Sequence, residues 1–527
     1  MLKSNKFSSL ARLSQVTSRA YLQLRFDSSL SKNQIQHKSP ANLESGSTDA
    51  SAAEDASATV LADLKDANKL TEHIGNRATW LEALAERKRQ LEQGKVIDSY
   101  SYNIPQKPII QEKTRSESFT YLVLNFKEDA YLTDFYASAA GRLRMGQIFQ
   151  DLDALAGRIA YRHVSPSSPV IVTASVDRIY MLKKVEELEK KNIILSGSVV
   201  WTGRSSMEIL IKASAVDEQV PSDLKEDDLN EEDIFLTASF TFVARNPETH
   251  KSFPVNKLLP ISEKEWVDFR RAESHNAAKK LIATKETLLK NPPTEEESRI
   301  IHSMYLESKK LEEIKQLPKN ISFMKDTETN STSFMQPQYR NRHSYMIFGG
   351  YLMRQSFELG YCTAAAFSRS FPRFISLDST TFKAPVPVGS VLYMNSKIVY
   401  TEHIHEADIK YNKDVSHEEF DGILHFDSEP ANKLTTDPND FLNRAGTLVQ
   451  VKVDTWVRDL NDIEQKPSGC FIYSYFVPRE SIEDDIADPG YSSVIPETYS
   501  EMIEFIEGRR RAIDTARYAQ QIKSSRA

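Results

Sequence analysis

Apolar side chains recur every three or four residues between 145 and 160 and predict one long helix with a wide apolar face. Segments rich in β-branched and aromatic residues predict strands near 119–124, 169–180, 192–202, 205–213 and 235–244. A helix that is apolar over so wide a face needs a sheet that curls around it. The first half therefore predicts a helix wrapped by antiparallel strands.

The same order recurs in the second half of the chain. Phe348-Gly349-Gly350 opens a second apolar helix, and strands are predicted after it at 373–383, 389–401, 446–457 and 469–477. Val172–Ile179 and Ile375–Phe382 occupy matching places, each a short turn after its helix. The sequence therefore predicts two copies of one unit, whose sheets run on into each other.

The remaining stretches are expected to connect or extend the two copies. The chain has 527 residues, which is too long for a single core. The expected segments are a linker with a helical extension (31–110), a first domain (111–255), a charged helical connector (256–330), a second domain (331–480) with a long polar loop at 404–444, and a helical tail (481–527).

Residues 1–30 are predicted to be a mitochondrial presequence, with the matrix as destination. Residues 1–26 carry five basic side chains and no acid, and serine is frequent among them. This composition is typical of such presequences, whereas the lack of a continuous apolar stretch argues against a secretory signal. A basic, disordered tail is the alternative.

Charge and cysteine content exclude several classes of protein. The net charge of −7 gives no basic field for nucleic acid, and no apolar run reaches membrane-spanning length. The two cysteines, Cys362 and Cys470, are far apart and form no CxxC pair, so neither a disulfide scaffold nor a cysteine-rich zinc site is expected. The histidines show no ligand spacing, so the sequence predicts no metal and no other cofactor.

Three stretches together carry a resemblance to a known family: Asp151–Gly157, Gly203–Glu208, and Gln336–His343 followed by Ile347–Gly350. They resemble the tandem hotdog thioesterases, and the last of them is similar to the mitochondrial acyl-CoA thioesterase 9 group. The resemblance covers roughly residues 110–480. It implies an α+β double hotdog, in which each curved antiparallel sheet wraps one central helix. It also implies an acyl-CoA substrate bound in the seam between the hotdogs, and homo-oligomers.

Thioester hydrolysis needs a group that orients or deprotonates water and donors that stabilise the developing oxyanion. A helix N-terminus offers free N–H groups and a partial positive charge, and glycine lets a substrate carbonyl approach them. Gly349 and Gly350 fit this role in the second half, and Gly146 fits it in the first. The alternative is that these glycines only relieve packing at a turn.

Asp153 is the predicted catalytic acid. It follows Gly146 by seven residues and precedes Gly157 by four, which places all three on one helical stripe. In the resembling family an aspartate at this place acts on the catalytic water. The alternative is a solvated surface carboxylate, which is the role expected for Asp151.

The second helix breaks this symmetry. Phe357 lies seven residues after Gly350, and Glu358 follows it as an alternative acid or as a salt-bridging residue. The family places an amide or an acid just before the paired glycines, whereas Met346 stands there in this chain. Asn341 lies a few residues upstream and could reach the site if the loop bulges, or could simply form a turn.

Guanidinium groups bind phosphate through paired hydrogen bonds, so arginines near the seam are candidates for binding coenzyme A. They are Arg142, Arg144, Arg178, Arg340 and Arg342. A different reading of the whole chain is a non-catalytic protein that binds acyl-CoA or serves as a structural subunit of a mitochondrial assembly. An enoyl-CoA hydratase is disfavoured, because no Asp–His pair precedes Met145.

Overall fold

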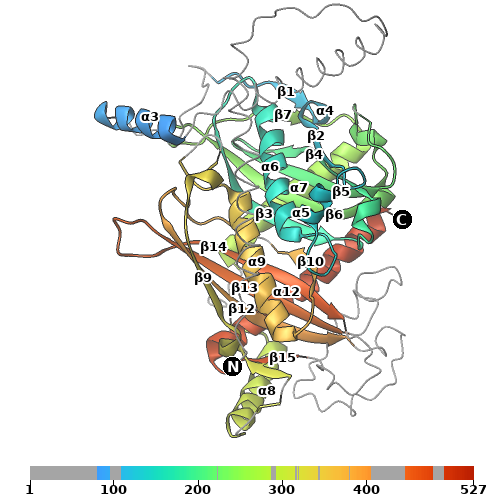
Figure 1. Ribbon diagram of the computed structural model, residues 1–527, viewed down its shortest axis with the longest axis vertical. Helices are drawn as coiled ribbons and strands as arrows, with labels where there is room; N and C mark the ends of the chain where they lie inside the picture. Colours follow the sequence, from blue (N-terminus) through green and yellow to red (C-terminus); the bar gives the residue numbers. More distant parts are fainter. Residues whose placement is uncertain are drawn as a thin grey trace, which may run out of the picture. The chain divides into compact units, whose positions relative to one another are not determined.

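The computed structural model of the protein divides into two units, Met1–Arg77 and Ala78–Ala527, and all described residues belong to the second (Figure 1). The structure describes residues 80–94, 108–221, 223–285, 292–314, 317–318, 320–341, 345–378, 380–404, 446–478 and 492–526. The expected presequence and linker, and nearly all of the expected polar loop, lie outside these residues.

One antiparallel sheet of 11 strands runs through the second unit. Its first half has the order β2-β4-β5-β6-β3. These strands are β2 (Thr120–Leu124), β3 (Val170–Met181), β4 (Asn192–Thr202), β5 (Ser206–Val216) and β6 (Ile234–Arg245). All five were predicted from the sequence, with bounds within a few residues.

The second half continues the same sheet in the order β10-β14-β13-β12-β9. These strands are β9 (Thr329–Phe334), β10 (Arg373–Leu377), β12 (Val391–Ile404), β13 (Gly446–Arg458) and β14 (Lys466–Pro478). The halves join where β10 and the short β11 (Thr380–Thr381) pair with β3, with Leu377 opposite Ile179. The expected run-on of one sheet into the other is confirmed.

Strand β9 was not predicted from the sequence. It reads Thr-Asn-Ser-Thr-Ser-Phe and lies at the end of the sheet, paired only with β12. Its side chains alternate between half-buried and exposed. An edge strand whose side chains are at most half-buried does not need an apolar face. Sequence patterning depends on that face, and a polar edge strand therefore gives no signal.

Two further sheets have two parallel strands each. β1 (Glu112–Thr114) pairs with β7 (Lys257–Leu259), and β8 (Ile321–Phe323) pairs with β15 (Ser493–Ile495). The connector and the tail, expected to be helical, thus each contribute strands as well. These strands are too short to produce a recognisable hydrophobic periodicity in the sequence.

Helices α6 (Met145–Val164) and α9 (Gly349–Ser368) are the two predicted central helices and pack against each other in the core (Figure 1). The other α-helices among the described residues are α3 (Trp80–Glu92), α4 (Arg115–Ser118), α5 (Ala130–Tyr136), α7 (Glu263–Lys285), α8 (Glu295–Glu312) and α12 (Tyr499–Arg526). None of the described helices combines the length and the hydropathy that a membrane-spanning segment needs.

The two faces of the sheet bury different helices. On β5, Met207 and Ile209 belong to the main core that contains α6, whereas Leu210 packs with Ala272 of α7. In the second half α12 covers the outer face, where Gln450 donates a hydrogen bond to the Gly508 carbonyl at 3.0 Å. Both faces are thus covered, and the α+β class with an antiparallel sheet is confirmed.

Candidate active site at two helix seams

The start of each central helix lies beside the middle of the other. Glycines allow this approach, because a Cβ atom on Gly350 would lie 2.9 Å from the Gln150 carbonyl oxygen of α6. A Cβ atom on Gly146 would lie 3.1 Å from the Phe357 ring of α9. The two helices therefore form two related seams, one at each helix start.

We call the first of these the acid seam, defined by Asp153, Thr173, Gly349 and Gly350. Asp153 is only 1% exposed. It accepts a hydrogen bond from the Thr173 hydroxyl at 2.9 Å and another from the Gly350 backbone N–H at 2.6 Å. A carboxylate of α6, a hydroxyl of β3 and the first turn of α9 thus meet at one point.

The environment of Asp153 tunes its acidity. Burial raises the pKa of Asp153 to about 6, although the hydrogen bonds from Thr173 and Gly350 oppose that rise. A general base works best when its pKa lies near the working pH. Asp153 therefore remains ionised at neutral pH and can accept a proton more readily than an exposed aspartate.

At position 349 there is little room for a side chain beside the Asp153 carboxylate. A Cβ atom there would lie 3.1 Å from Asp153 Oδ2, closer than most side-chain contacts. The glycines thus serve packing at the helix crossing and also keep the backbone open toward the carboxylate. Gly350 therefore has the packing role that was the alternative from sequence. This role is compatible with its backbone N–H serving as a donor to the substrate.

We call the second the phenylalanine seam, defined by Phe357, Glu358, Gly146 and Arg144. Because α6 begins at Met145 and α9 at Gly349, Phe357 occupies in α9 the position that Asp153 occupies in α6. Phe357 is 5% exposed and packs edge-on against Phe149, with ring centres 5.0 Å apart. An aromatic ring has replaced the carboxylate.

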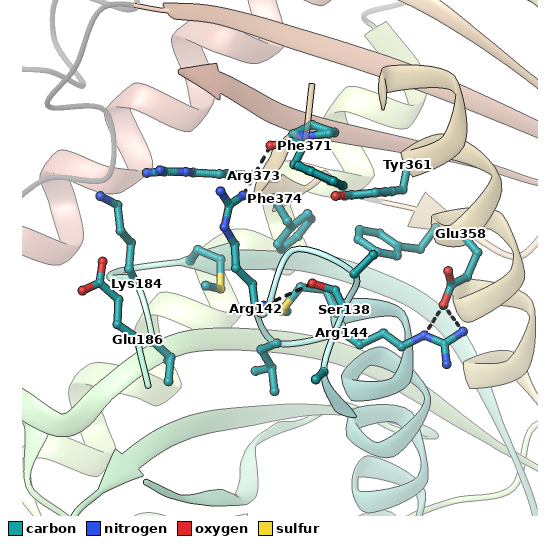
Figure 2. Close-up of a pocket in the computed structure, with 18 residues that line it drawn as sticks. Ser138, Arg142, Arg144, Lys184, Glu186, Glu358, Tyr361, Phe371, Arg373 and Phe374 are labelled. Atoms are coloured by element: carbon teal, nitrogen blue, oxygen red, sulfur yellow. Dashed lines mark hydrogen bonds and ion pairs between the residues drawn. The ribbon is translucent and has the colours of Figure 1, made fainter. Parts of the chain in front are cut away.

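A cavity of about 420 Å³ lies at the phenylalanine seam (Figure 2). Its lining includes Arg142, Arg144, Phe357 and Glu358. Arg144 and Glu358 form an ion pair at 2.8 Å, with about a third of each side chain exposed. Glu358 thus takes the salt-bridging role that was its alternative from sequence.

The five arginines expected near the seam do not gather at one place. Arg142 and Arg144 line the cavity, whereas Arg178 lies over the Tyr518 ring of α12 at 4.7 Å. Arg340 lies over the ring of Trp80 at 5.7 Å, and Arg342 is outside the described residues. Arg178 and Arg340 thus each contact an aromatic ring, and the backbone of Arg340 bridges to Ile347 just before α9. The role of these arginines in binding coenzyme A stays a prediction.

Three further positions differ from, or add to, what the sequence predicts. Asp151 is not a solvated carboxylate: Tyr136 donates to it at 2.5 Å, and burial raises the pKa of Asp151 to about 6. Asn341 makes no hydrogen bond to Asp153 within the described part of the chain; its backbone N–H binds the Met346 carbonyl at 2.7 Å. Thr173 was not singled out, since only the fold brings β3 next to α6.

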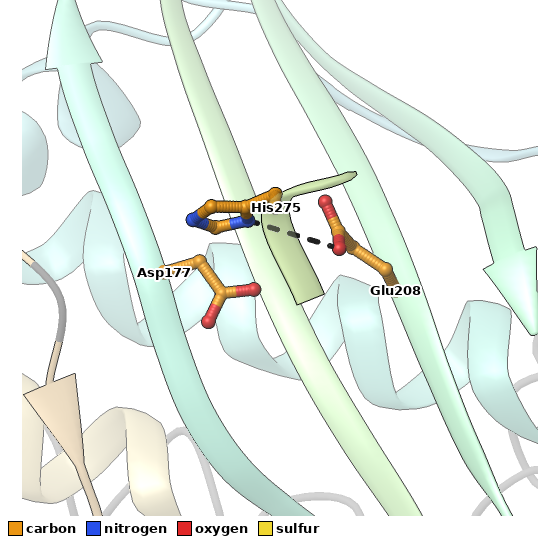
Figure 3. A group of neighbouring side chains, drawn as sticks. All are labelled: Asp177, Glu208 and His275. Carbon is orange, nitrogen blue, oxygen red and sulfur yellow. Dashed lines mark ion pairs between the residues drawn. The ribbon is translucent and has the colours of Figure 1, made fainter. Parts of the chain in front are cut away.

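Asp177, Glu208 and His275 form a group that could hold a metal ion, with ligand atoms within 4.8 Å of one another (Figure 3). Each of the four carboxylate oxygens already accepts a hydrogen bond. The donors are Ser175, Thr241, Ser239 and Asn276. These bonds offset the burial of the two acids, so we assign no role in the reaction to this group.

Comparison with known proteins gives close sequence relatives. Human mitochondrial acyl-coenzyme A thioesterase 9 is 31% identical over 84% of this chain and 86% of its own length. A chloroplastic acyl-coenzyme A thioesterase 2 of hop (Humulus lupulus) is 34% identical over 56% of this chain, and the match spans 66% of the hop protein. No family model matches the chain.

Solved structures are more distant. An acyl-CoA hydrolase from Staphylococcus aureus in complex with butyryl coenzyme A is 20% identical, with a TM-score of 0.26 over 33% of this chain and 92% of that one. The sequence match to the human protein, in contrast, spans more than four fifths of both chains. The chain therefore belongs to the acyl-coenzyme A thioesterase family, the thioester hydrolases that include the mitochondrial thioesterase 9 proteins.

Proposed function

We propose that this protein hydrolyses fatty acyl-CoA to free fatty acid and CoA at the acid seam. One observation carries the assignment: the Asp153 carboxylate of one half meets the Gly350 amide of the other. A base and an oxyanion donor are thus in direct contact across the seam. Membership of the thioesterase family supports the activity, and the geometry supports the choice of seam.

In the proposed mechanism the thioester carbonyl oxygen replaces Asp153 as the acceptor of the Gly350 N–H. Asp153, still held by Thr173, takes a proton from water while the water oxygen attacks the carbonyl carbon. The N-terminus of α9 stabilises the resulting oxyanion. Collapse of the tetrahedral intermediate breaks the C–S bond, and the CoA thiolate takes up a proton as it leaves.

We infer that each half is a hotdog, with α6 or α9 as its central helix. The matching strand orders on either side of the β3–β10 junction support this double-hotdog assignment. Both acid-seam partners come from one chain, so a single chain can supply a complete site. Further association into homo-oligomers is part of the proposal, as the family resemblance implies.

An acyl-CoA panel from acetyl to palmitoyl, with thiol release followed on the purified mature chain, tests the proposal. Hydrolysis of at least one ester is expected. A chain that binds CoA esters but releases no thiol with any of them would replace this proposal with the non-catalytic reading.

Residues before about Leu30 are expected to be absent from the mature protein, because the basic, acid-free stretch fits a presequence. The mitochondrial names of the relatives agree with this location, and the matrix is our proposed destination. N-terminal sequencing of protein recovered from mitochondria is the measurement. Recovery of an intact Met1 would contradict the expectation.

Glu358→Gln is expected to change kcat by less than about threefold. A partly exposed ion pair contributes about 0–1 kcal/mol, and Glu358 lies at the seam that lacks the carboxylate. Steady-state kinetics on the best substrate of the panel check this. Loss of activity in this variant, with Asp153→Asn unaffected, would place the reaction at the phenylalanine seam.

A further inference from the structure

A cavity lies at the seam that lacks the acid. The two seams are counterparts, because each joins the start of one central helix to the residue eight positions after the first residue of the other. At the acid seam the Asp153 side chain is buried, and a cavity of about 420 Å³ lies beside Phe357 at the other seam (Figure 2). Cavities of roughly 300–1,000 Å³ are typical of small-molecule sites.

The charged side chains of the cavity favour an anion. Four cationic residues line it (Arg142, Arg144, Lys184 and Arg373), against the two carboxylates of Glu186 and Glu358. Glu358 is engaged by Arg144. The Arg142 side chain forms no ion pair among the described residues and donates one hydrogen bond there, to the Phe371 carbonyl at 3.3 Å. A local excess of cations in a chain of net charge −7 indicates an anionic ligand.

The arrangement of these groups is polarised. Figure 2 shows Arg142, Lys184, Glu186 and Arg373 on one side of the cavity, and the Arg144–Glu358 pair on the other. The lining also has an apolar part, which includes Leu143, Met145, Met181, Phe357 and Phe374. Phe371 is 53% exposed, so the rim beside Arg142 is open to solvent. Charge at a solvent-exposed rim above an apolar interior matches an amphipathic anion.

We propose that this cavity binds an anionic acyl compound, either a free fatty acid or an acyl-CoA ester, and does not hydrolyse it. The anionic head lies against Arg142 and its cationic neighbours, and the hydrocarbon chain lies against the aromatic lining. No base stands where Asp153 stands in the other seam, because Phe357 occupies that position. The non-hydrolytic character rests on the proposed function of the acid seam; the binding itself does not.

Equilibrium dialysis of the full chain with radiolabelled palmitate and, separately, palmitoyl-CoA tests this inference. The chain carries Asp153→Asn so that the ester persists during the measurement. Adding Arg142→Glu is expected to weaken binding of at least one of the two ligands by about 10- to 100-fold, since a charge-assisted contact becomes a repulsion. Of palmitate and palmitoyl-CoA, the one that binds more tightly and depends on Arg142 is identified as the ligand of the cavity. A measurement with CoA alone shows how much the nucleotide part contributes to the affinity.

Arg158→Glu is the matched control, because it reverses the charge of an exposed arginine on the nearby helix α6 that does not line the cavity. It is expected to leave both dissociation constants unchanged. Thermal melts of both variants exclude unfolding, which is not expected because the Arg142 side chain makes only one long hydrogen bond within the described part of the chain. Equal binding by the Arg142→Glu chain and its parent would overturn the inference.

The inference and the proposed function can fail separately. If the wild-type chain hydrolyses no ester but binds palmitate in an Arg142-dependent manner, the proposed function fails and the cavity assignment stands. If the wild type is active and Arg142→Glu alters neither ligand's binding, the cavity assignment fails and the acid seam stands.

Discussion

Asp153→Asn is expected to lower kcat by about 100- to 10,000-fold, the usual cost of removing a general base. The substitution should lower kcat and leave the affinity for acyl-CoA unchanged. Asparagine has nearly the same shape as aspartate, but its side chain cannot accept the proton. An amide cannot deprotonate the attacking water. Single-turnover and steady-state kinetics, with thiol release as the signal, separate the two effects.

The variant is also expected to fold, which makes the result interpretable. Its amide oxygen can accept from the Gly350 N–H, and its amide N–H can donate to the Thr173 hydroxyl, which serves as donor or acceptor. Both contacts of the buried carboxylate thus have replacements. A melting temperature close to that of the wild type would establish that the loss is chemical.

A matched control is Asp134→Asn, because Asp134 is an exposed carboxylate on α5. It is expected to change kcat by less than about twofold, as for most surface substitutions. Asp151 cannot serve this purpose, because it is hydrogen-bonded to Tyr136. Full activity in Asp153→Asn, on an enzyme that does hydrolyse acyl-CoA, would refute the proposed role of Asp153.

The activity of the wild-type enzyme is expected to fall about tenfold per pH unit below about pH 6. Asp153 must be ionised to accept a proton, and burial raises its pKa to about 6. Above that pH the carboxylate is ionised and kcat/KM should be flat, whereas at pH 5 about a tenth of the plateau should remain. A kcat/KM profile between pH 4.5 and 8 measures this.

Asp151 supplies the decisive control for the pH profile, since burial raises its pKa to about 6 as well. The Asp151→Asn enzyme should keep the inflection near pH 6 if Asp153 is the titrating base. The residual activity of Asp153→Asn should lose it. An inflection that disappears with Asp151→Asn and survives Asp153→Asn would move the base to Asp151.

The sequence alone determined the order of the elements. Period-two and period-3.6 patterns mark segments whose buried faces are long, and these include both central helices and the long strands. The register of the two helices also follows from sequence, since seven residues separate Gly146 from Asp153 and Gly350 from Phe357. The choice of Asp153 as the candidate acid follows from this spacing together with the family resemblance, and the phenylalanine at its counterpart in the second copy follows from the spacing.

The tertiary structure alone decided which groups meet. Thr173 reaches Asp153 because β3 lies beside α6, and Arg178 stacks on Tyr518 because α12 folds back over the sheet. The cavity lies at the phenylalanine seam, although sequence placed the chemistry at the other. Periodicity reports which face of an element is buried, but partners far apart in the chain are set by packing, and packing also sets the pKa of a buried carboxylate.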